Sequence, residues 1–161
     1  MIVSLNETEQ IIARHLAKRR YENNRERGLP DQQVGGQPSE YTDLNGIGGE
    51  MAFAKLFNLY PDLGDTPGKE DGTTRQGATY DVKVTKYKRG HLVAVLNKKV
   101  KDCEFYVLMI GEFPKYRLTG YATAEELLSG DFIKDLGHGP GHAMSQDSPA
   151  FKSFAQEEFP F

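Results

Sequence analysis

The tripeptide Asp81-Val82-Lys83 places a carboxylate and an ammonium group on alternate residues. The surrounding segment TYDVKVT predicts a strand over residues 79–85, in which Asp81 and Lys83 share one face. A carboxylate at this position can bind a hard divalent cation, and the lysine can hold a phosphate oxygen or orient and deprotonate a water molecule. The alternative is a structural ion pair, because such a tripeptide is common by chance.

A second carboxylate, Asp71, precedes this strand in the segment KEDGTT. If residues 77–79 turn the chain, the two segments form a hairpin and Asp71 faces Asp81. Two converging carboxylates repel each other unless a cation lies between them. The alternative is a simple Asp-Gly turn, and Asp65 and Glu70 are rival candidates for the same role.

A third carboxylate, Glu50, lies in the segment GIGGEMAFA, which predicts a helix. Gly46 and Ala54 are each one helical turn away, so Glu50 shares a face with small residues, where a solvated glutamate is not expected. The glycines cost about 1 kcal/mol each relative to alanine, which predicts a close approach of the helix backbone to a neighbour. In the alternative, Gly48-Gly49 begins the helix and Glu50 interacts with its dipole.

The elements around these residues predict an α/β fold with a mixed central sheet flanked by helices. Ser4 and Glu7 form the sequence pattern of a capping box before a helix that runs to about residue 27. Residues 30–43 predict a loop, and the apolar runs VAVL and YVLMI predict strands covered on both faces. The other predicted elements are helices over residues 44–58, after Thr123 and after Ser148-Pro149, and strands over residues 91–96, 105–110 and 116–122.

Length and composition predict one domain over residues 1–161. Within it we expect an N-terminal helix (1–29) and a C-terminal extension (131–161). Cys103 is the only cysteine, which excludes an internal disulfide and suits a reducing compartment. The N-terminal residues lack a signal-peptide pattern, and no apolar run reaches the roughly 20 residues of a membrane span. We therefore expect a soluble, cytoplasmic protein.

The net charge of −3 is not that of a typical nucleic-acid-binding protein, but the basic residues are unevenly distributed. No acidic residue lies between Lys83 and Lys101. Lys86, Lys88 and Arg89 follow the predicted strand directly, and such a local basic surface can hold phosphates because salt screens distant charges over about 10 Å. A solvated lysine-rich hairpin is the alternative.

Together these residues resemble the pattern of the PD-(D/E)XK nuclease superfamily, and in particular its small phage and prokaryotic members. That pattern has a glutamate on the first core helix, then an aspartate, then a D/E-x-K tripeptide on the next strand. The resemblance covers about residues 43–130, although no proline precedes the first aspartate. It implies a restriction-endonuclease-like fold with an αβββαβ-type core, and the matching residues are Glu50, Asp71, Asp81 and Lys83.

The resemblance implies a nuclease that hydrolyses DNA phosphodiester bonds with Mg²⁺, or Mn²⁺ as a substitute, in phage or prokaryotic DNA processing. Asp71, Asp81 and the backbone carbonyl of Val82 would ligate the metal. Glu50 would bind a second metal or orient a water molecule there, and Lys83 would position the attacking water and stabilise charge on the phosphate. The cytoplasm would be that of a prokaryote or of a phage-infected host.

The DNA backbone would contact a basic segment beyond the active strand, formed by Lys86, Lys88, Arg89 and His91. Cutting both strands of a duplex would favour a homodimer. A protein of the same fold that has lost catalysis and serves as a DNA-binding or structural module is the main alternative. A zinc site at His138 and His142 is not expected, because Gly139-Pro140-Gly141 prevents a helix between them.

Overall fold

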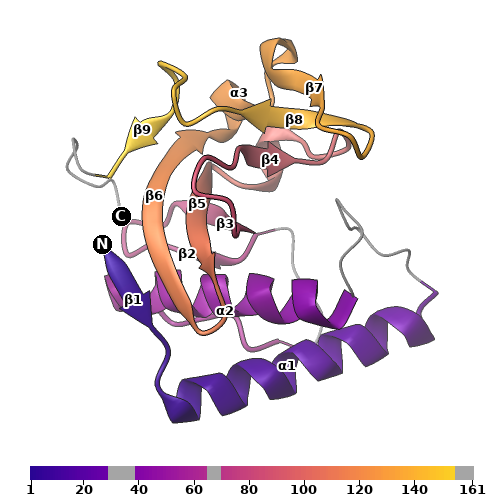
Figure 1. Cartoon of the computed structure of the whole chain (residues 1–161), viewed down its shortest axis with the longest axis vertical. Coiled ribbons are helices and arrows are strands. Elements are labelled where there is room, and N and C mark those ends of the chain that lie inside the picture. The colour runs from indigo at the N-terminus through magenta and orange to yellow at the C-terminus, as the bar shows by residue number, and fades with distance from the viewer. Residues whose placement is uncertain (29–38, 65–69, 155–161) are drawn as a thin grey trace.

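A computed structural model of the chain describes residues 1–28, 39–64 and 70–154 (Figure 1). Its helices are α1 (Glu7–Glu26), α2 (Ser39–Phe57) and α3 (Ala124–Leu127), with 3-10 turns η1 (Val100–Asp102) and η2 (Gly130–Phe132). Its strands are β1 (Ile2–Ser4), β2 (Gly72–Thr73), β3 (Thr79–Thr85), β4 (Leu92–Ala94), β5 (Phe105–Glu112), β6 (Lys115–Thr123), β7 (Ile133–Asp135), β8 (Pro140–Met144) and β9 (Lys152–Ser153).

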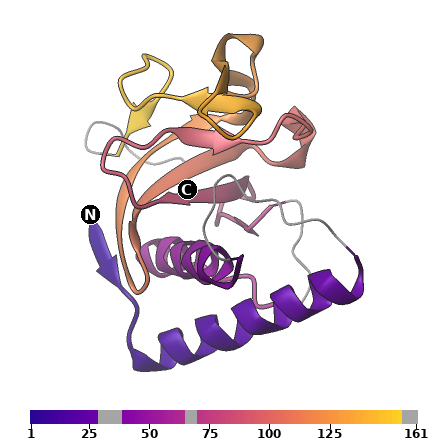
Figure 2. The same cartoon turned by 45° about the vertical axis from the view of Figure 1, so that its right-hand side comes forward.

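The strands form two sheets, which confirms an α/β protein with a mixed sheet. The larger sheet has the order β1-β6-β5-β3-β2, with β9 also paired to β6; β3 and β5 are parallel and the other pairs are antiparallel. The smaller sheet has the antiparallel order β4-β8-β7. Helix α2 lies against one face of the larger sheet with α1 outside it, and the smaller sheet covers the opposite side (Figures 1 and 2).

The larger sheet separates two hydrophobic cores. Along β5, Val107 and Met109 pack toward the helices, while Tyr106, Leu108 and Ile110 pack toward the smaller sheet. This two-sided burial is what the run YVLMI predicted. The run VAVL was expected to form a central strand, but β4 is three residues long and belongs to the smaller sheet, where it pairs with β8.

The N-terminal helix begins two residues later than its sequence pattern predicts. Asn6, not Ser4, is the N-cap, and it forms a capping box with Glu9. The reason is tertiary: Val3 lies opposite Tyr116 in the β1–β6 pairing, so Ser4, which was expected to cap the helix, is part of a strand, and Glu7 is the first residue of α1. Sequence pattern alone did not reveal β1.

Helix α2 begins at Ser39, within the segment that was expected to be a loop, and ends at Phe57. The predicted close approach of its glycines is confirmed. A Cβ atom on Gly48 would overlap the hydroxyl of Tyr116, and one on Gly49 would overlap a methyl group of Val84. These two glycines therefore set the distance between α2 and the sheet.

The C-terminal part of the chain differs from the expectation. Thr123 caps α3 as predicted, with Glu126 completing a capping box. The helix expected after Ser148-Pro149 is absent through residue 154; the chain turns and adds β9 to β6 instead. The Nζ atom of Lys152 lies 2.9 Å from both carboxylate oxygens of Glu126, which ties β9 to α3.

Within residues 1–28, 39–64 and 70–154, no helix combines the length and apolar character needed to cross a membrane.

We expect Gly49→Ala to lower the free energy of unfolding by about 1–3 kcal/mol, because the added methyl group overlaps Val84 in a packed interface. Gly46→Ala is the matched control in the same helix, since a methyl group there would meet no described atom outside that helix within 4 Å. It should stabilise the protein by up to about 1 kcal/mol through helix propensity. Urea denaturation measures both changes, and equal effects of the two substitutions would contradict this packing.

Candidate active site

The four residues singled out from the sequence meet at the edge of the larger sheet where β2 begins. Strand β2 pairs only with Tyr80 and Thr79 of β3. Val82, which follows on β3, has no partner residue in β2. Its N–H instead donates to the side-chain oxygen Oδ2 of Asp71 at 2.6 Å. The Asp71 N–H in turn donates to the Tyr80 carbonyl at 2.8 Å. The predicted hairpin is therefore formed, and Asp71 faces the strand that carries Asp81.

Asp81 is the buried centre of the site. Its side chain is only 3% exposed, while that of Lys83 is 33% exposed. The Nζ atom of Lys83 lies 2.5 Å from Asp81 Oδ1, and the Nζ atom of Lys98 lies 2.9 Å from Asp81 Oδ2. Despite its short distance to Lys83, Oδ1 accepts no hydrogen bond of acceptable geometry. One carboxylate thus lies between two ammonium groups.

Lys98 was not identified as a site residue from the sequence, although it belongs to the basic segment between residues 83 and 101. It lies in the turn after β4, where its N–H donates to the Val95 carbonyl at 3.1 Å. Its approach to Asp81 depends on the connection that leads from β3 through β4 and η1 to β5. Periodicity within one strand cannot predict such a contact.

Glu50 points inward from α2, as its helical position predicts, and is held by Arg20 of α1. The Nη1 atom of Arg20 donates to Glu50 Oε2 at 3.2 Å. The same guanidinium donates to Asp62 Oδ2 at 2.9 Å and to the backbone carbonyls of Asp62 and Gly64 at 3.2 and 3.1 Å. Arg20 is buried, and its partners explain why a charged group is stable there. Because α2 begins at Ser39, Glu50 is not at the helix start.

Arg20 was also missed in the sequence. The signal was present, since Arg20 follows Ala13, Leu16 and Ala17 on the buried face of α1. An arginine on such a face requires buried acceptors, but the sequence does not show that Glu50 is one of them.

The carboxylates of the site influence one another. Burial raises the pKa of Asp71 well above its usual range, and the charges of Glu50 and Asp81 raise it further. Burial also raises the pKa of Glu50, against the opposing effect of Arg20. Burial alone would lower the pKa of Lys83, but the nearby charges of Asp81, Asp71 and Glu50 outweigh it and raise that pKa. Burial and mutual repulsion therefore oppose ionisation of these carboxyl groups, while Lys83 beside them keeps its proton.

This donor set suits a hard divalent cation. Glu50, Asp71 and Asp81 are close enough to repel one another, and the buried Asp81 Oδ1 accepts no hydrogen bond of acceptable geometry although Lys83 lies beside it. The carbonyl of Val82 faces the same sheet edge as its N–H. As the side chains stand, no group of three or more His, Cys, Asp or Glu in the described part of the chain is arranged to hold a metal ion. A cation at Asp81 would therefore have to displace a lysine.

The rival acidic and histidine candidates are not supported in the same way. Asp65 lies outside the described residues. Glu70 is half-buried, but the carboxylate that binds the Val82 N–H belongs to Asp71. His142 is buried in β8 and His138 is exposed, and they belong to no group arranged as a metal site within the described residues.

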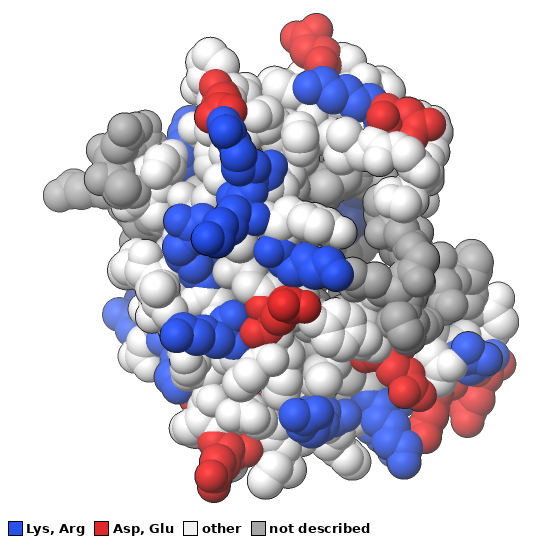
Figure 3. All heavy atoms as spheres, in the orientation of Figure 1, with Lys and Arg blue, Asp and Glu red and all other residues white. Residues whose placement is uncertain are grey.

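The predicted basic segment lies on the loop between β3 and β4, directly after the strand that carries Asp81. Lys86, Lys88 and Arg89 are exposed and His91 is half-buried. Arg89 forms an ion pair with Asp147 at 3.1 Å, with both side chains more than three-quarters exposed, so the pair contributes little to stability. Figure 3 shows basic side chains gathered across the middle of one face.

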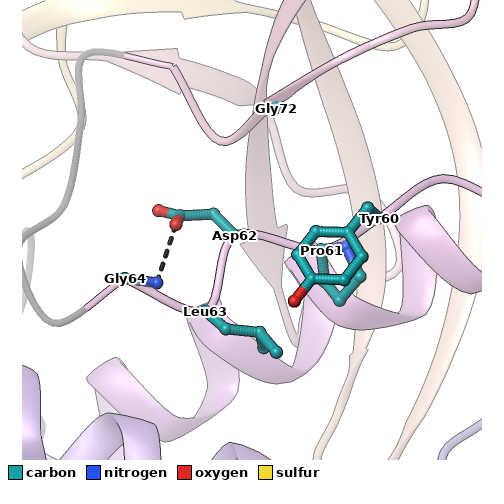
Figure 4. A pocket seen from close by; sticks show the side chains of 6 residues that line it. All are labelled: Tyr60, Pro61, Asp62, Leu63, Gly64 and Gly72. Atoms are coloured by element: carbon teal, nitrogen blue, oxygen red, sulfur yellow. Dashed lines mark hydrogen bonds between the residues drawn. The ribbon is translucent and has the colours of Figure 1, made fainter.

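A hollow of about 420 Å³ adjoins the site (Figure 4). It is lined by Gly72, which follows Asp71, and by the segment from Tyr60 to Gly64. Asp62 on its wall shares the guanidinium of Arg20 with Glu50. The hollow therefore lies beside Asp71 and next to the residues that hold Glu50.

Comparisons with known proteins identify no relative: no family model, curated protein or solved structure matches this chain.

We expect the metal-free protein to lose stability with rising pH, with Asp71 as a main cause. A folded-state pKa raised above the ordinary 3.8 gives stabilisation that is complete below pH 3.8 and is lost as pH rises through the raised pKa. Asp71→Asn keeps an oxygen for the Val82 N–H and removes the charge. In EDTA, its melting temperature should fall less steeply than that of the wild type as pH rises above 3.8. Parallel curves would contradict the crowding of these carboxylates.

Proposed function

We propose that the chain is a metal-dependent nuclease of the PD-(D/E)XK type that hydrolyses DNA phosphodiester bonds. The observation that carries the proposal is the meeting of Glu50, Asp71, Asp81 and Lys83 at one sheet edge, although they come from α2, from the residue before β2 and from β3. If these four residues matched the motif only by chance, there would be no reason for them to lie together in the structure.

In this proposal α2 is the first helix of a restriction-endonuclease-like core, and the β2–β3 hairpin carries its catalytic residues. The later elements correspond less closely to an αβββαβ order. The connection between the parallel strands β3 and β5 contains β4 and η1, and α3 has only four residues. The site therefore supports the family assignment more strongly than the order of the later elements does.

Asp71, Asp81 and the Val82 carbonyl would hold Mg²⁺ or Mn²⁺, with Glu50 beside them. A bound divalent ion would neutralise negative charge on the phosphate and lower the pKa of water. Lys83 is one-third exposed next to Asp81, so its ammonium can hold a phosphate oxygen or orient the attacking water. Arg20 fixes the Glu50 carboxylate through a buried ion pair.

Lys86, Lys88, Arg89 and His91 would bind the DNA backbone without reading its sequence. A homodimer would place two such sites on opposite strands of a duplex. A catalytically inert DNA-binding module is the second candidate, and one observation favours it: both oxygens of Asp81 are already engaged by lysines.

A cleavage assay separates the two candidates. Labelled linear, circular and branched DNA are incubated with the protein in EDTA, Mg²⁺ or Mn²⁺. The proposal expects products with 5′-phosphate ends in Mg²⁺ or Mn²⁺ and none in EDTA, and no products with Asp81→Asn. A folded wild-type protein that cleaves none of these DNAs with either metal would favour the inert module.

We expect Lys83→Met to lower the cleavage rate by at least about a hundredfold while the protein stays folded, because methionine keeps most of the stem and removes the ammonium group. Lys134→Met, at an exposed position of β7, is the matched control and should cleave like the wild type. Single-turnover rates and circular dichroism measure activity and folding. A wild-type rate for Lys83→Met would contradict the active-site assignment.

We expect simultaneous neutralisation of Lys86, Lys88 and Arg89 to weaken DNA binding for all sequences and to reduce its salt dependence. Removing one interaction with a phosphate lowers the slope of log K against log salt by about one. Binding isotherms at several salt concentrations measure this slope for DNAs of different sequence. An unchanged slope would place the DNA on another surface.

A further inference from the structure

We propose that Lys98 is a second lysine of the site, which leaves Asp81 when a divalent cation binds and then contacts the nucleic-acid phosphate. This inference rests on the proposed function and gives it a regulatory feature: binding of the cation and binding of the nucleic acid favour each other. Lys98 lies outside the motif that identified the other four residues.

The first step concerns the two lysines that contact the Asp81 carboxylate. Lys83 and Lys98 approach different oxygens of its carboxylate, at 2.5 and 2.9 Å. The Asp81 side chain is 3% exposed, so water can supply little of the stabilisation that these lysines give to its negative charge. A divalent cation that binds either oxygen within a few ångströms of two ammonium groups meets strong repulsion. At least one lysine has to move.

The second step is the choice between the two lysines. Lys83 lies on the same strand as Asp81, and the charges of Asp71 and Glu50 as well as Asp81 act on its ammonium group. Lys98 approaches from the turn after β4, a separate segment, and its side chain is 20% exposed. Its flexible four-carbon stem allows the ammonium group to swing toward solvent without moving β3. Lys83 has the same stem and its side chain is 33% exposed, but the attraction of three carboxylates favours keeping its ammonium group in place. The proposal therefore has the cation displace Lys98.

The third step is the new partner of Lys98. A phosphodiester held at the sheet edge beside Lys83 brings negative charge close to the released ammonium group. Lys98 then exchanges one anionic partner for another, and the cost of leaving Asp81 is offset only when both cation and nucleic acid are bound. Coupling of this kind is reciprocal and is commonly worth about 5–150-fold in affinity.

The alternative is a structural lysine that ties the β4–η1 turn to the larger sheet. Both roles predict a lower melting temperature for Lys98→Met, so stability does not separate them. The factor by which a cation raises nucleic-acid affinity does separate them, because a purely structural lysine has no different partner in the two states.

The test measures binding of a short fluorescent DNA duplex by anisotropy in EDTA and in Ca²⁺, with intact DNA verified on a gel. The wild type should bind about tenfold more tightly in Ca²⁺ than in EDTA, and Lys98→Met should keep less than about a third of that factor. In the absence of DNA, Lys98→Met should bind Mn²⁺ at least as tightly as the wild type by calorimetry, since a competing cation is gone.

Two variants serve as controls. Lys99→Met removes a neighbouring, exposed lysine and should leave the coupling factor unchanged, even if it weakens binding in both buffers. Lys98→Arg retains a positive charge, should melt near the wild-type temperature and should retain most of the coupling. If Lys98→Met fails to fold, a loss of coupling in Lys98→Gln decides the question in the same way.

The outcomes separate this inference from the proposed function. A wild type that cleaves DNA, with full coupling in Lys98→Met, overturns the role of Lys98 and leaves the nuclease proposal standing. Coupling that depends on Lys98 in a wild type that never cleaves supports the role of Lys98 and overturns hydrolysis. Equal affinity of the wild type in EDTA and Ca²⁺ overturns the coupling itself.

Discussion

The buried carboxylate of Asp81, held between Lys83 and Lys98, is the interaction on which the arrangement of the site depends. A charge at 3% exposure is stable only with close partners, and losing one of them would be costly. The connection from β3 to β5 through β4 and η1 brings Lys98 to this carboxylate. These contacts explain how carboxylates can be crowded here without a metal: the lysines supply part of the charge that a cation would supply.

A second buried ion pair connects the helical layer to the same edge. Arg20 joins α1 to Glu50 of α2 and to the segment at Asp62 and Gly64, so the outer helix helps to orient a site residue. The glycines of α2 complete this arrangement, because Gly49 lets the helix approach Val84 closely enough for Glu50 to influence Asp71. Packing and electrostatics therefore act on the same few residues.

The features that could be predicted from the sequence are those with local causes. Alternation along TYDVKVT gave the bounds of β3 and the shared face of Asp81 and Lys83, and the position of Glu50 on its helix gave its inward orientation. The features that were missed depend on distant pairing. Val3 becomes a strand residue only because Tyr116 lies opposite, and β4 joins the smaller sheet only because β8 is available. Lys98 and Arg20 are polar residues whose partners lie far along the chain, and no periodicity identifies such partners.

In the proposed function, this sheet edge binds a divalent cation through Asp71 and Asp81. An anomalous difference map from crystals soaked in Mn²⁺ tests it most directly, because the map locates the ion without reference to activity. We expect a peak within about 2.0–2.6 Å of carboxylate oxygens of both aspartates, the range of hard-cation coordination, with Lys98 turned away from Asp81. A map from well-soaked crystals with no peak at this edge, and with Lys98 still on Asp81, would contradict it.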